Sequence, residues 1–183
     1  MAFKFVRTKG GIGRKLELVK LTDGQAMEVG DAIKTYSTGY GVFATASAPV
    51  LGIVDSFCDS MGLPLQADKV VAGTASGVDV LSLTTSSTYA LVDCSQDTIY
   101  SVPFSGTIDT TGTSSSLRGG YIDVDSAGTK YGHVLETSHS RDVSASNAGD
   151  SRNFYNRGLD PTDSTRLLVS IAYSELNTQI KTD

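Results

Sequence analysis

The sequence predicts an all-β protein, either a β-sandwich or a β-tulip-like barrel, with an extended N-terminal arm and at most one short helix. Serine, threonine and glycine make up about a third of the 183 residues, a composition that suits short strands joined by many turns. Turn signals recur at short intervals, which is the spacing expected of a sandwich or barrel. Hydrophobic residues make up 39% of the chain, enough to bury a sizeable core, so global disorder is excluded.

The length fits one domain with a short appendage. We expect residues 1–14 to form a basic arm that ends in a glycine hinge, and residues 15–183 to form a single β-rich domain. Gly10, Gly11 and Gly13 give the hinge its backbone freedom. The arm is therefore expected to reach away from the body.

Candidate strands follow one another along the body, separated by turns. Residues 15–21 alternate so that Leu16 and Leu18 are expected to face the core. Residues 50–54 are the most apolar stretch and are expected to form the central strand. Residues 65–72 could form two turns of helix. Further strands are predicted at residues 32–36, 40–46, 78–83, 89–93, 98–104, 121–124, 131–135 and 165–173, and a tight turn at residues 160–163.

Charge is divided unevenly along the chain. Residues 1–20 carry a net charge of +5, and the remaining residues carry −10. An acidic body argues against a nucleic-acid partner, for which a basic stripe should dominate. No apolar run is long enough to span a bilayer, and residues 1–30 lack the apolar core of a signal peptide, so no membrane partner is expected. The basic arm is expected either to contact an acidic surface or to be a solvated terminal strand.

Motifs for a cofactor or a metal ion are incomplete. Residues 39–44 match the letters of a dinucleotide fingerprint, but Pro49 leaves no room for the helix that must follow. Residues 123–128 match part of a calcium loop, but Val134 stands where the bidentate glutamate belongs. We therefore expect no cofactor and no metal ion.

Signals for catalysis are equally weak. His133 and His139 are the only histidines and lack a dependable third metal ligand. Residues 138–142 contain the residue types of a hydrolytic triad, but adjacency in sequence is not the required geometry. We expect no enzyme, with a small hydrolase that uses either histidine as an alternative. Cys58 and Cys94 are expected to be buried thiols in a reducing compartment.

Two groups of residues are predicted to make protein contacts. In the arm, Phe3 and Phe5 are expected to bury against a partner while the neighbouring cations pair with acidic groups. Residues 152–157 combine arginine with aromatic residues, types that are enriched at interface hot spots; an ordinary strand with two exposed arginines explains the same letters. The predicted contact residues are Phe3, Lys4, Phe5, Arg7, Lys9, Arg14, Lys15, Arg152, Phe154, Tyr155 and Arg157.

Two stretches of the chain resemble a known class of protein. Residues 29–33 (VGDAI) and 46–54 (ASAPVLGIV) combine the entry to a bounded β-unit with a glycine-interrupted apolar strand. This arrangement resembles that of small head proteins of tailed bacteriophages, which decorate or cement the capsid. Residues 158–163 (GLDPTD), followed by an apolar strand, are similar in style. The resemblance covers residues 26–57 and 150–175 and contains no chemical motif, so it carries over no catalytic residue.

The resemblance implies a β-sandwich or β-tulip body bound to the outer capsid lattice. We therefore expect a structural virion protein on the capsid exterior, made in the host bacterial cytoplasm, that stabilises a phage capsid by bridging capsomers. Its expected partners are the major capsid protein and further copies of the same chain in a homo-oligomer. A head-fibre base, or a glycan-binding β-sandwich that uses tyrosine-rich loops, is the alternative that the sequence leaves open.

Overall fold

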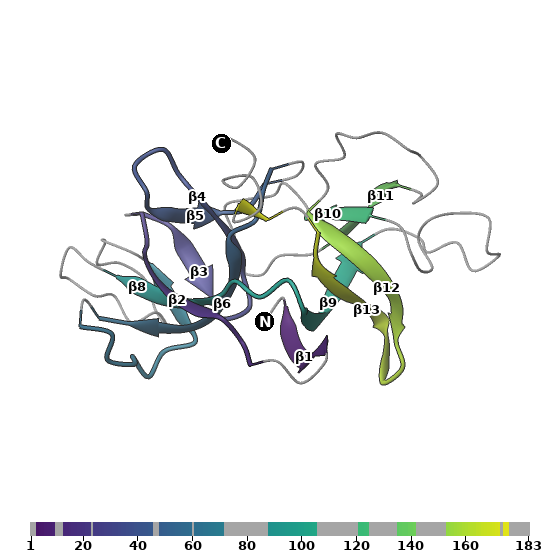
Figure 1. Cartoon of the computed structure of the whole chain (residues 1–183), viewed down its shortest axis with the longest axis horizontal. Helices are drawn as coiled ribbons and strands as arrows, with labels where there is room; N and C mark the ends of the chain where they lie inside the picture. The colour runs from purple at the N-terminus through teal and green to yellow at the C-terminus, as the bar shows by residue number, and fades with distance from the viewer. Residues whose placement is uncertain are drawn as a thin grey trace.

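The computed structural model is an all-β protein with open, sandwich-like sheets (Figure 1). The structure describes residues 3–9, 13–22, 24–45, 48–59, 61–71, 88–105, 121–124, 135–141, 153–172 and 174–175. In this part of the chain there are thirteen strands and no helix as long as one turn.

The strands form two large sheets and one small sheet. Sheet A has the spatial order β1 (Lys4–Thr8), β9 (Thr98–Ser105), β11 (Leu135–Arg141), β10 (Tyr121–Val124), β12 (Phe154–Asp160) and β13 (Asp163–Ile171). Sheet B has the order β2 (Leu16–Lys20), β8 (Tyr89–Asp93), β6 (Gly52–Cys58), β4 (Ala32–Thr35) and β5 (Gly41–Phe43). Sheet C consists of β3 (Ala26–Glu28) and β7 (Lys69–Val71).

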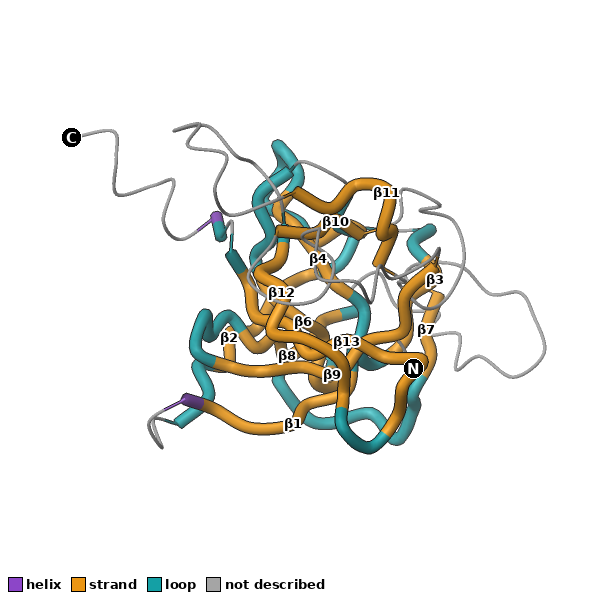
Figure 2. Tube along the Cα trace, turned by 90° about the vertical axis from the view of Figure 1, so that its right-hand side faces the viewer, coloured by secondary structure: helices purple, strands orange, loops and turns teal. Residues whose placement is uncertain are grey.

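Sheet A bends back on itself, because β13 pairs with β9 as well as with β12. The pairing is thin where β11 meets β9, at Phe104 and Ser105. Neither large sheet is a closed barrel, so the sandwich alternative describes the fold. Figures 1 and 2 together place sheet A on one side of the molecule and sheets B and C on the other.

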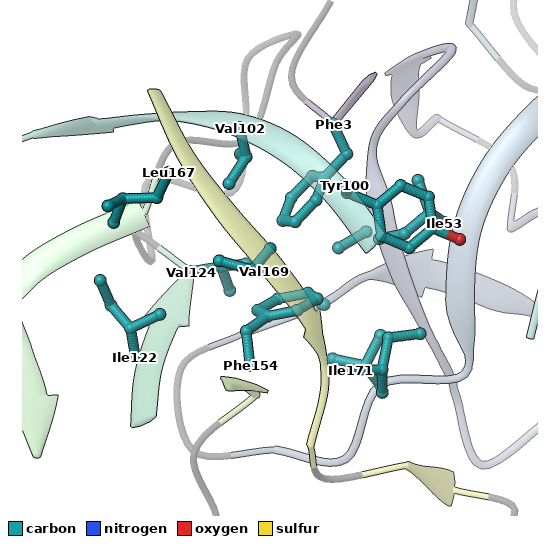
Figure 3. Close-up of a cluster of buried hydrophobic side chains, with 13 residues drawn as sticks. Phe3, Ile53, Tyr100, Val102, Ile122, Val124, Phe154, Leu167, Val169 and Ile171 are labelled. Carbon is teal, nitrogen blue, oxygen red and sulfur yellow. The ribbon is translucent and has the colours of Figure 1, made fainter. Parts of the chain in front are cut away.

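The larger core cluster lies where the two large sheets meet (Figure 3). Sheet A contributes most of its side chains, including the fully buried Phe154 and Leu167, and sheet B contributes Ala32 and Ile53. Burying a large apolar side chain stabilises a fold by about 1.5–3 kcal/mol. This cluster therefore holds the two sheets together.

A second cluster lies on the opposite face of sheet B, where sheet C covers it. Successive residues of a strand point to opposite faces, so Ile53 enters the first cluster while Val54 enters the second. Met27 of β3 and Val70 of β7 complete the second cluster. The chain is buried on both faces where it enters β6. Residues 50–54 therefore form an uninterrupted apolar run instead of an alternating one.

The chain crosses from sheet A to sheet B after β13. Ser174 pairs with Val50 in an isolated parallel bridge, and the Glu175 amide donates to the Val50 carbonyl at 3.1 Å. The Glu175 carboxylate accepts hydrogen bonds from the amide and the hydroxyl of Thr35 at the end of β4. The end of β13 is thereby fastened to sheet B.

Several predicted elements are confirmed. Residues 89–93 and 121–124 are the strands β8 and β10, and the apolar run leads into β6, the middle strand of sheet B. The turn predicted at residues 160–163 joins β12 to β13, and the Asp160 carboxylate accepts a hydrogen bond from the Thr162 amide at 2.9 Å.

The helix predicted over residues 65–72 is wrong. Lys69–Val71 form β7 instead, and this strand pairs with β3. The pairing satisfies the backbone and buries the β-branched Val70, which outweighs a weak helical pattern. Residues 78–83 and 131–134, where other strands were predicted, lie outside the described residues.

Gly52 is where β6 packs most closely against β8. A Cβ atom there would clash with the backbone oxygen of Asp93 and lie 2.6 Å from Val92 Cγ1. We predict that Gly52→Ala lowers the free energy of unfolding by about 1–3 kcal/mol, because overpacking forces the strands apart. Gly13→Ala is the matched control, since a Cβ at Gly13 meets no atom within 4 Å. Equal urea midpoints for the two variants would contradict this packing.

Candidate functional site

The predicted N-terminal arm lies on the protein's own body as β1. The strand pairs antiparallel with β9, with Lys4 opposite Ser101. The side chain of Phe3 is only 2% exposed, and its ring lies 4.8 Å from that of Phe154 and 6.0 Å, edge-on, from that of Tyr100. The expectation that Phe3 anchors a free arm to a partner is therefore wrong. The ring of Phe3 packs into the apolar core of its own chain, and the backbone of β1 adds to the edge of β9.

The cations of this segment are partly neutralised within the chain. Lys9 lies 3.9 Å from Asp97, and Lys15 forms an ion pair with Glu17 at 2.8 Å. The exposed Lys4 and Arg7 form no ion pair with any described residue. Two positive charges on β1 thus stay available to an acidic partner. Arg14 belongs to a separate network.

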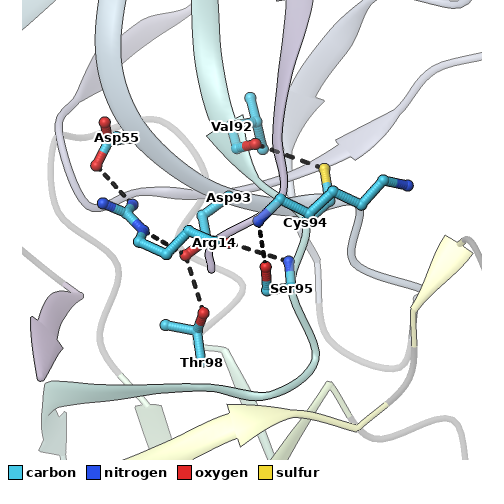
Figure 4. A network of polar contacts seen from close by, with 8 residues as sticks. Arg14, Asp55, Val92, Asp93, Cys94, Ser95 and Thr98 are labelled. Atoms are coloured by element: carbon cyan, nitrogen blue, oxygen red, sulfur yellow. Dashed lines mark hydrogen bonds and ion pairs between the residues drawn. The ribbon is translucent and has the colours of Figure 1, made fainter. Parts of the chain in front are cut away.

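Arg14 joins sheet B to the connection between β1 and β2 (Figure 4). Its Nε donates to Asp93 Oδ2 at 2.8 Å, and its Nη2 donates to Asp55 Oδ1 at 2.5 Å. The fully buried Asp93 also accepts hydrogen bonds from Thr98 Oγ1 and from the Ser95 amide, both at 3.0 Å. Because Thr98 begins β9, this one carboxylate connects sheet B to sheet A.

The network keeps both charged partners ionised. Burial alone would raise the pKa of Asp93, but the hydrogen bonds from Arg14 and Ser95 outweigh burial and lower that pKa. Burial likewise opposes the charge on Arg14, and its hydrogen bonds to Asp93 and Asp55 outweigh that effect and raise its pKa. Arg14 was predicted as a contact residue, but it acts inside the protein as the partner of a buried carboxylate.

Apolar side chains surround this network on the outside. The Arg14 guanidinium lies over the Phe5 ring, 4.8 Å from its centre. Leu16 is the cross-strand neighbour of Asp93, and Leu18 is opposite Leu91 on the same face of sheet B. Phe5 and Leu16 are each 43% exposed and Leu18 is 46% exposed. These residues therefore expose apolar surface on β1 and β2.

We call the exposed residues of β1 and of the start of β2 the β1–β2 surface. It combines exposed apolar side chains with cations on two edge strands, one from each large sheet, and its residues are Lys4, Phe5, Val6, Arg7, Lys15, Leu16 and Leu18.

The prediction that Leu16 and Leu18 face the core is wrong. Val19 and Leu21 are buried instead. A period of two defines two faces of a strand, but it does not say which face is covered when both are apolar. The sequence signal that could have identified this surface is the presence of apolar residues on both faces of a strand at the edge of a sheet.

A cavity of about 210 Å³ opens beneath β1, between the two large sheets. Its walls include the rings of Phe3, Phe5 and Tyr100, together with Ile53, Arg14 and Lys4. The cavity lining thus combines aromatic and aliphatic side chains with Lys4 and with the ion pair between Arg14 and Asp55.

The second predicted contact group, residues 152–157, is divided between the core and the surface. Phe154 is fully buried, so its assignment as a contact residue is wrong; Tyr155 and Arg157 are half-buried on the opposite face of β12. The Arg157 guanidinium lies 4.5 Å from the Tyr155 ring centre and donates two hydrogen bonds to Ser170 Oγ. Arg152 lies outside the described residues.

Asn153, just before β12, holds the start of this strand in place through hydrogen bonds to neighbouring segments. Its side-chain amide donates to the Thr45 and Ala48 carbonyls at 3.3 and 2.5 Å, and its side-chain oxygen accepts from the Val124 amide at 3.0 Å. The Asn153 amide donates in turn to the buried carboxylate of Asp123 at 2.9 Å. Asp123, at the start of the calcium-like stretch, is thus part of the core.

The other motifs are placed as follows. Residues 39–44 form a turn, with Gly39 at φ +81°, and the strand β5, so no helix follows the glycines. His133 lies outside the described residues, and only the backbone of His139 in β11 is described. No group of three or more metal-ligating side chains occurs among the described residues. No helix in that same part of the chain is long and apolar enough to cross a membrane.

Both cysteines are buried, as expected, and neither forms a disulfide. Burial raises the pKa of the Cys94 thiol to about 12, and it also raises the pKa of Cys58. Both thiols therefore stay protonated near neutral pH and are weak nucleophiles.

Phe3 and Phe5 provide a matched test of how β1 is attached. We predict that Phe3→Ala lowers the free energy of unfolding by about 3–5 kcal/mol, because it opens a cavity in the core. Phe5→Ala should cost less than about 1 kcal/mol, because the ring is already half in water. Urea unfolding of both variants measures the difference. Equal costs would mean that β1 is not held by Phe3.

The Asp93 carboxylate predicts a pH dependence of stability. Its folded pKa lies below the ordinary value of 3.8. Its stabilising contribution is therefore complete above that value and is lost as the pH falls through the folded pKa. In Asp93→Asn, the unfolding free energy should be lower at pH 7 and should fall less between pH 7 and pH 3 than in the wild type. Asp97→Asn, which removes an exposed carboxylate, should keep the wild-type dependence; a wild-type dependence in Asp93→Asn would refute this role.

No protein-family model matches the chain, and no curated protein or solved structure matches it. The β1–β2 surface and the cavity beneath β1 are the features of the described residues on which a function can be argued.

Proposed function

We propose that this protein is a structural virion protein that binds the outer surface of a bacteriophage capsid and stabilises it by bridging neighbouring capsomers as an oligomer. The observation that carries the proposal is the β1–β2 surface, where exposed apolar side chains lie beside Lys4 and Arg7, two cations that pair with none of the described acidic residues. The phage context rests on the resemblance of residues 26–57 and 150–175 to capsid-cementing head proteins.

The β1–β2 surface has the chemistry of a protein contact. Covering the exposed side chains of Phe5, Leu16 and Leu18 removes hydrocarbon from water, which is the main favourable contribution to most protein association. Lys4 and Arg7 add attraction to acidic groups and so favour particular partners. The strands are already ordered by their own sheets, so little conformational entropy is lost on binding.

Bridging requires more than one contact per assembly. A single copy needs to bind only weakly, because each contact of an oligomer raises the effective concentration of the next. Edge strands of a folded body, and not a free tail, would make these contacts. Deleting residues 1–13 would therefore remove β1 and the buried Phe3 and would damage the fold, so the test uses point substitutions.

The double variant Lys4→Ser/Arg7→Ser tests the proposal by co-sedimentation with capsids. Each exposed ion pair contributes about 0.2–1 kcal/mol, so we predict binding that is about three- to tenfold weaker and less sensitive to salt. Thr38→Glu/Ser164→Glu is the control, because it changes the net charge equally at two exposed sites away from this surface. Undiminished binding of the serine variant, or an equal loss in the control, would refute the role of the surface.

A glycan-binding module is the second candidate, and the hairpin between β4 and β5 favours it. Tyr36 is 55% exposed there, and Tyr40 is partly exposed beneath the Lys20 ammonium, which lies 4.6 Å from its ring centre. A neighbouring cavity of about 280 Å³ is lined by polar groups that include Glu17 and Thr35. On a glycan array, a selective signal that Tyr36→Ala abolishes would favour this candidate, whereas a capsid-binding protein should give none.

A further inference from the structure

One edge of β2 is open to a further strand. β2 is the terminal strand of sheet B and pairs with β8 through residues 16–20 in an unbroken register. Just before it, the Cys94 amide donates to the Lys15 carbonyl at 2.8 Å. Alternate residues of an antiparallel strand bond to the same neighbour, so the odd-numbered residues bond to β8. The amides and carbonyls of Leu16 and Leu18 therefore point away from β8.

The space beside this edge is not filled by another strand. Within the described part of the chain, β8 is the only strand that pairs with β2. β5 reaches the chain only beyond β2, where the Thr22 amide donates to the Gly41 carbonyl at 3.0 Å. A cavity of about 280 Å³ separates residues 17–20 from Thr35 and Gly39 of the β4–β5 hairpin. An open edge of this kind can pair with a strand of another chain.

β1, the other edge strand of the β1–β2 surface, is less suited to such pairing. Its register shifts between Phe5 and Arg7, and a bulge bends a strand and interrupts the ladder. At its start, the Phe3 amide already donates to the Gly30 carbonyl at 2.9 Å. β2 has neither a bulge nor a proline or glycine in its five residues. Of the two strands, β2 is therefore the one that offers a regular edge.

The sequence of β2 is complementary to itself when a second copy runs antiparallel to it. With Leu16 opposite Leu16 of the second copy, Lys15 of each chain lies opposite Glu17 of the other. These are the closer pairs of an antiparallel ladder, with Cα atoms about 4.5 Å apart, and opposite charges in such pairs stabilise a sheet. Lys15 already forms an ion pair with Glu17 of its own chain at 2.8 Å. Four charges of alternating sign would thus gather on one face.

The opposite face of the same pairing is apolar. The Leu16 side chains of the two copies lie directly opposite each other, and Leu18 of each copy is the diagonal neighbour of Leu16 of the other. Both leucines are more than two-fifths exposed in the single chain. The pairing therefore covers the apolar side chains that β2 leaves in water.

The neighbouring registers are less favourable. Only the outward-facing residues can form the hydrogen-bonded pairs, so the possible registers differ by two residues. With Leu16 opposite Leu18, Glu17 would stand opposite Glu17 of the other copy, and like charges in this position destabilise a sheet. With Leu18 opposite Leu18, the second copy would reach Leu21, where β5 already forms a bridge.

We infer that two copies of this protein form a twofold dimer in which their β2 strands pair antiparallel, with Leu16 at the axis. Such a contact joins the same surface of both copies, so it closes at two. The inference rests on the proposed function and deepens its oligomeric part: it assigns Leu16 and Leu18 to the second copy and leaves Lys4, Phe5 and Arg7 to the capsid. Each dimer then carries two β1 strands, the pair of contacts that bridging needs.

Sedimentation velocity of the full chain over a range of concentrations tests the inference. The wild type should form dimers and no larger species as its concentration rises. Lys15→Glu sets carboxylates opposite each other on both sides of the axis and should weaken the dimer by about tenfold or more. Gln66→Glu/Ser164→Glu makes the same charge change at two exposed sites away from β2 and should dimerise like the wild type. A wild type that stays monomeric or grows beyond dimers, or a Lys15→Glu variant that dimerises normally, overturns the inference.

Mixing two charge variants tests the register. Lys15→Glu leaves only acidic side chains on this face of the contact and Glu17→Lys leaves only basic ones, so each alone should dimerise weakly and the mixture should form heterodimers. Lys15→Glu/Glu17→Lys in one chain should dimerise like the wild type. Glu17→Lys mixed with Gln66→Glu/Ser164→Glu should gain nothing, which separates pairing from attraction by net charge. Failure of both the mixture and the combined variant to dimerise overturns the register.

Leu16→Pro tests the hydrogen bonds at the axis. Proline removes an amide hydrogen that points away from β8, so the ladder between β2 and β8 keeps its bonds, whereas the dimer loses two hydrogen bonds. Leu16→Ala is the control, because it shortens the side chain and keeps the amide. The proline variant should dimerise more weakly than the alanine variant, and equal dimerisation of the two would contradict strand pairing. The charge variants decide the matter if the proline variant does not fold.

Co-sedimentation with capsids separates this inference from the proposed function. Dimers that depend on Lys15 and Glu17, in a protein that does not bind capsids, would leave the inference standing and remove the proposed function. A wild type that binds capsids but is monomeric in solution at every concentration would overturn the inference and leave the capsid contact of β1 standing.

Discussion

The ion pair between Arg14 and Asp93 is the constraint on which the rest of this structure depends. A buried carboxylate is costly unless it is paired and hydrogen-bonded, and Asp93 meets this requirement with donors from two parts of the chain, Arg14 before β2 and the turn from Ser95 to Thr98. The same contacts fix the start of β2 and the turn that leads from sheet B into sheet A. The relative position of the two sheets is therefore set by electrostatics as well as by the apolar cluster between them.

The attachment of β1 follows from this arrangement. Once the sheets are in place, the core offers Phe3 a site beside Phe154, and β9 offers its free edge to the backbone. In this arrangement the apolar side chains of Phe5, Leu16 and Leu18 remain partly exposed to water. A basic segment that begins the chain thus becomes a rigid surface, and the proposed contacts depend on shape as much as on charge.

Local features of the fold were predictable from the sequence because local residues determine them. Strand β8, strand β10 and the turn at residues 160–163 depend on alternation and on turn chemistry within a few residues. The burial of the first part of β6 on both faces was likewise indicated by the unbroken apolar run of residues 50–54.

Features that depend on distant partners were not predictable in this way. The contact between Phe3 and Tyr100 joins residues far apart in the chain, and the identity of the covered face of β2 depends on sheet C. The alternation of Phe154, Tyr155 and Arg157 separates the buried ring from the half-buried residues, whereas the hot-spot composition of this stretch does not distinguish them.

The crossing of the chain after β13 has a consequence for how the molecule comes apart. Phe3 ties the segment before sheet B into the core of sheet A, while Glu175 ties the segment after sheet A onto Thr35 of sheet B. Both ends of the described chain are therefore fastened near the place where the two large sheets meet. Such contacts couple the two sheets and favour cooperative unfolding over the independent melting of each sheet.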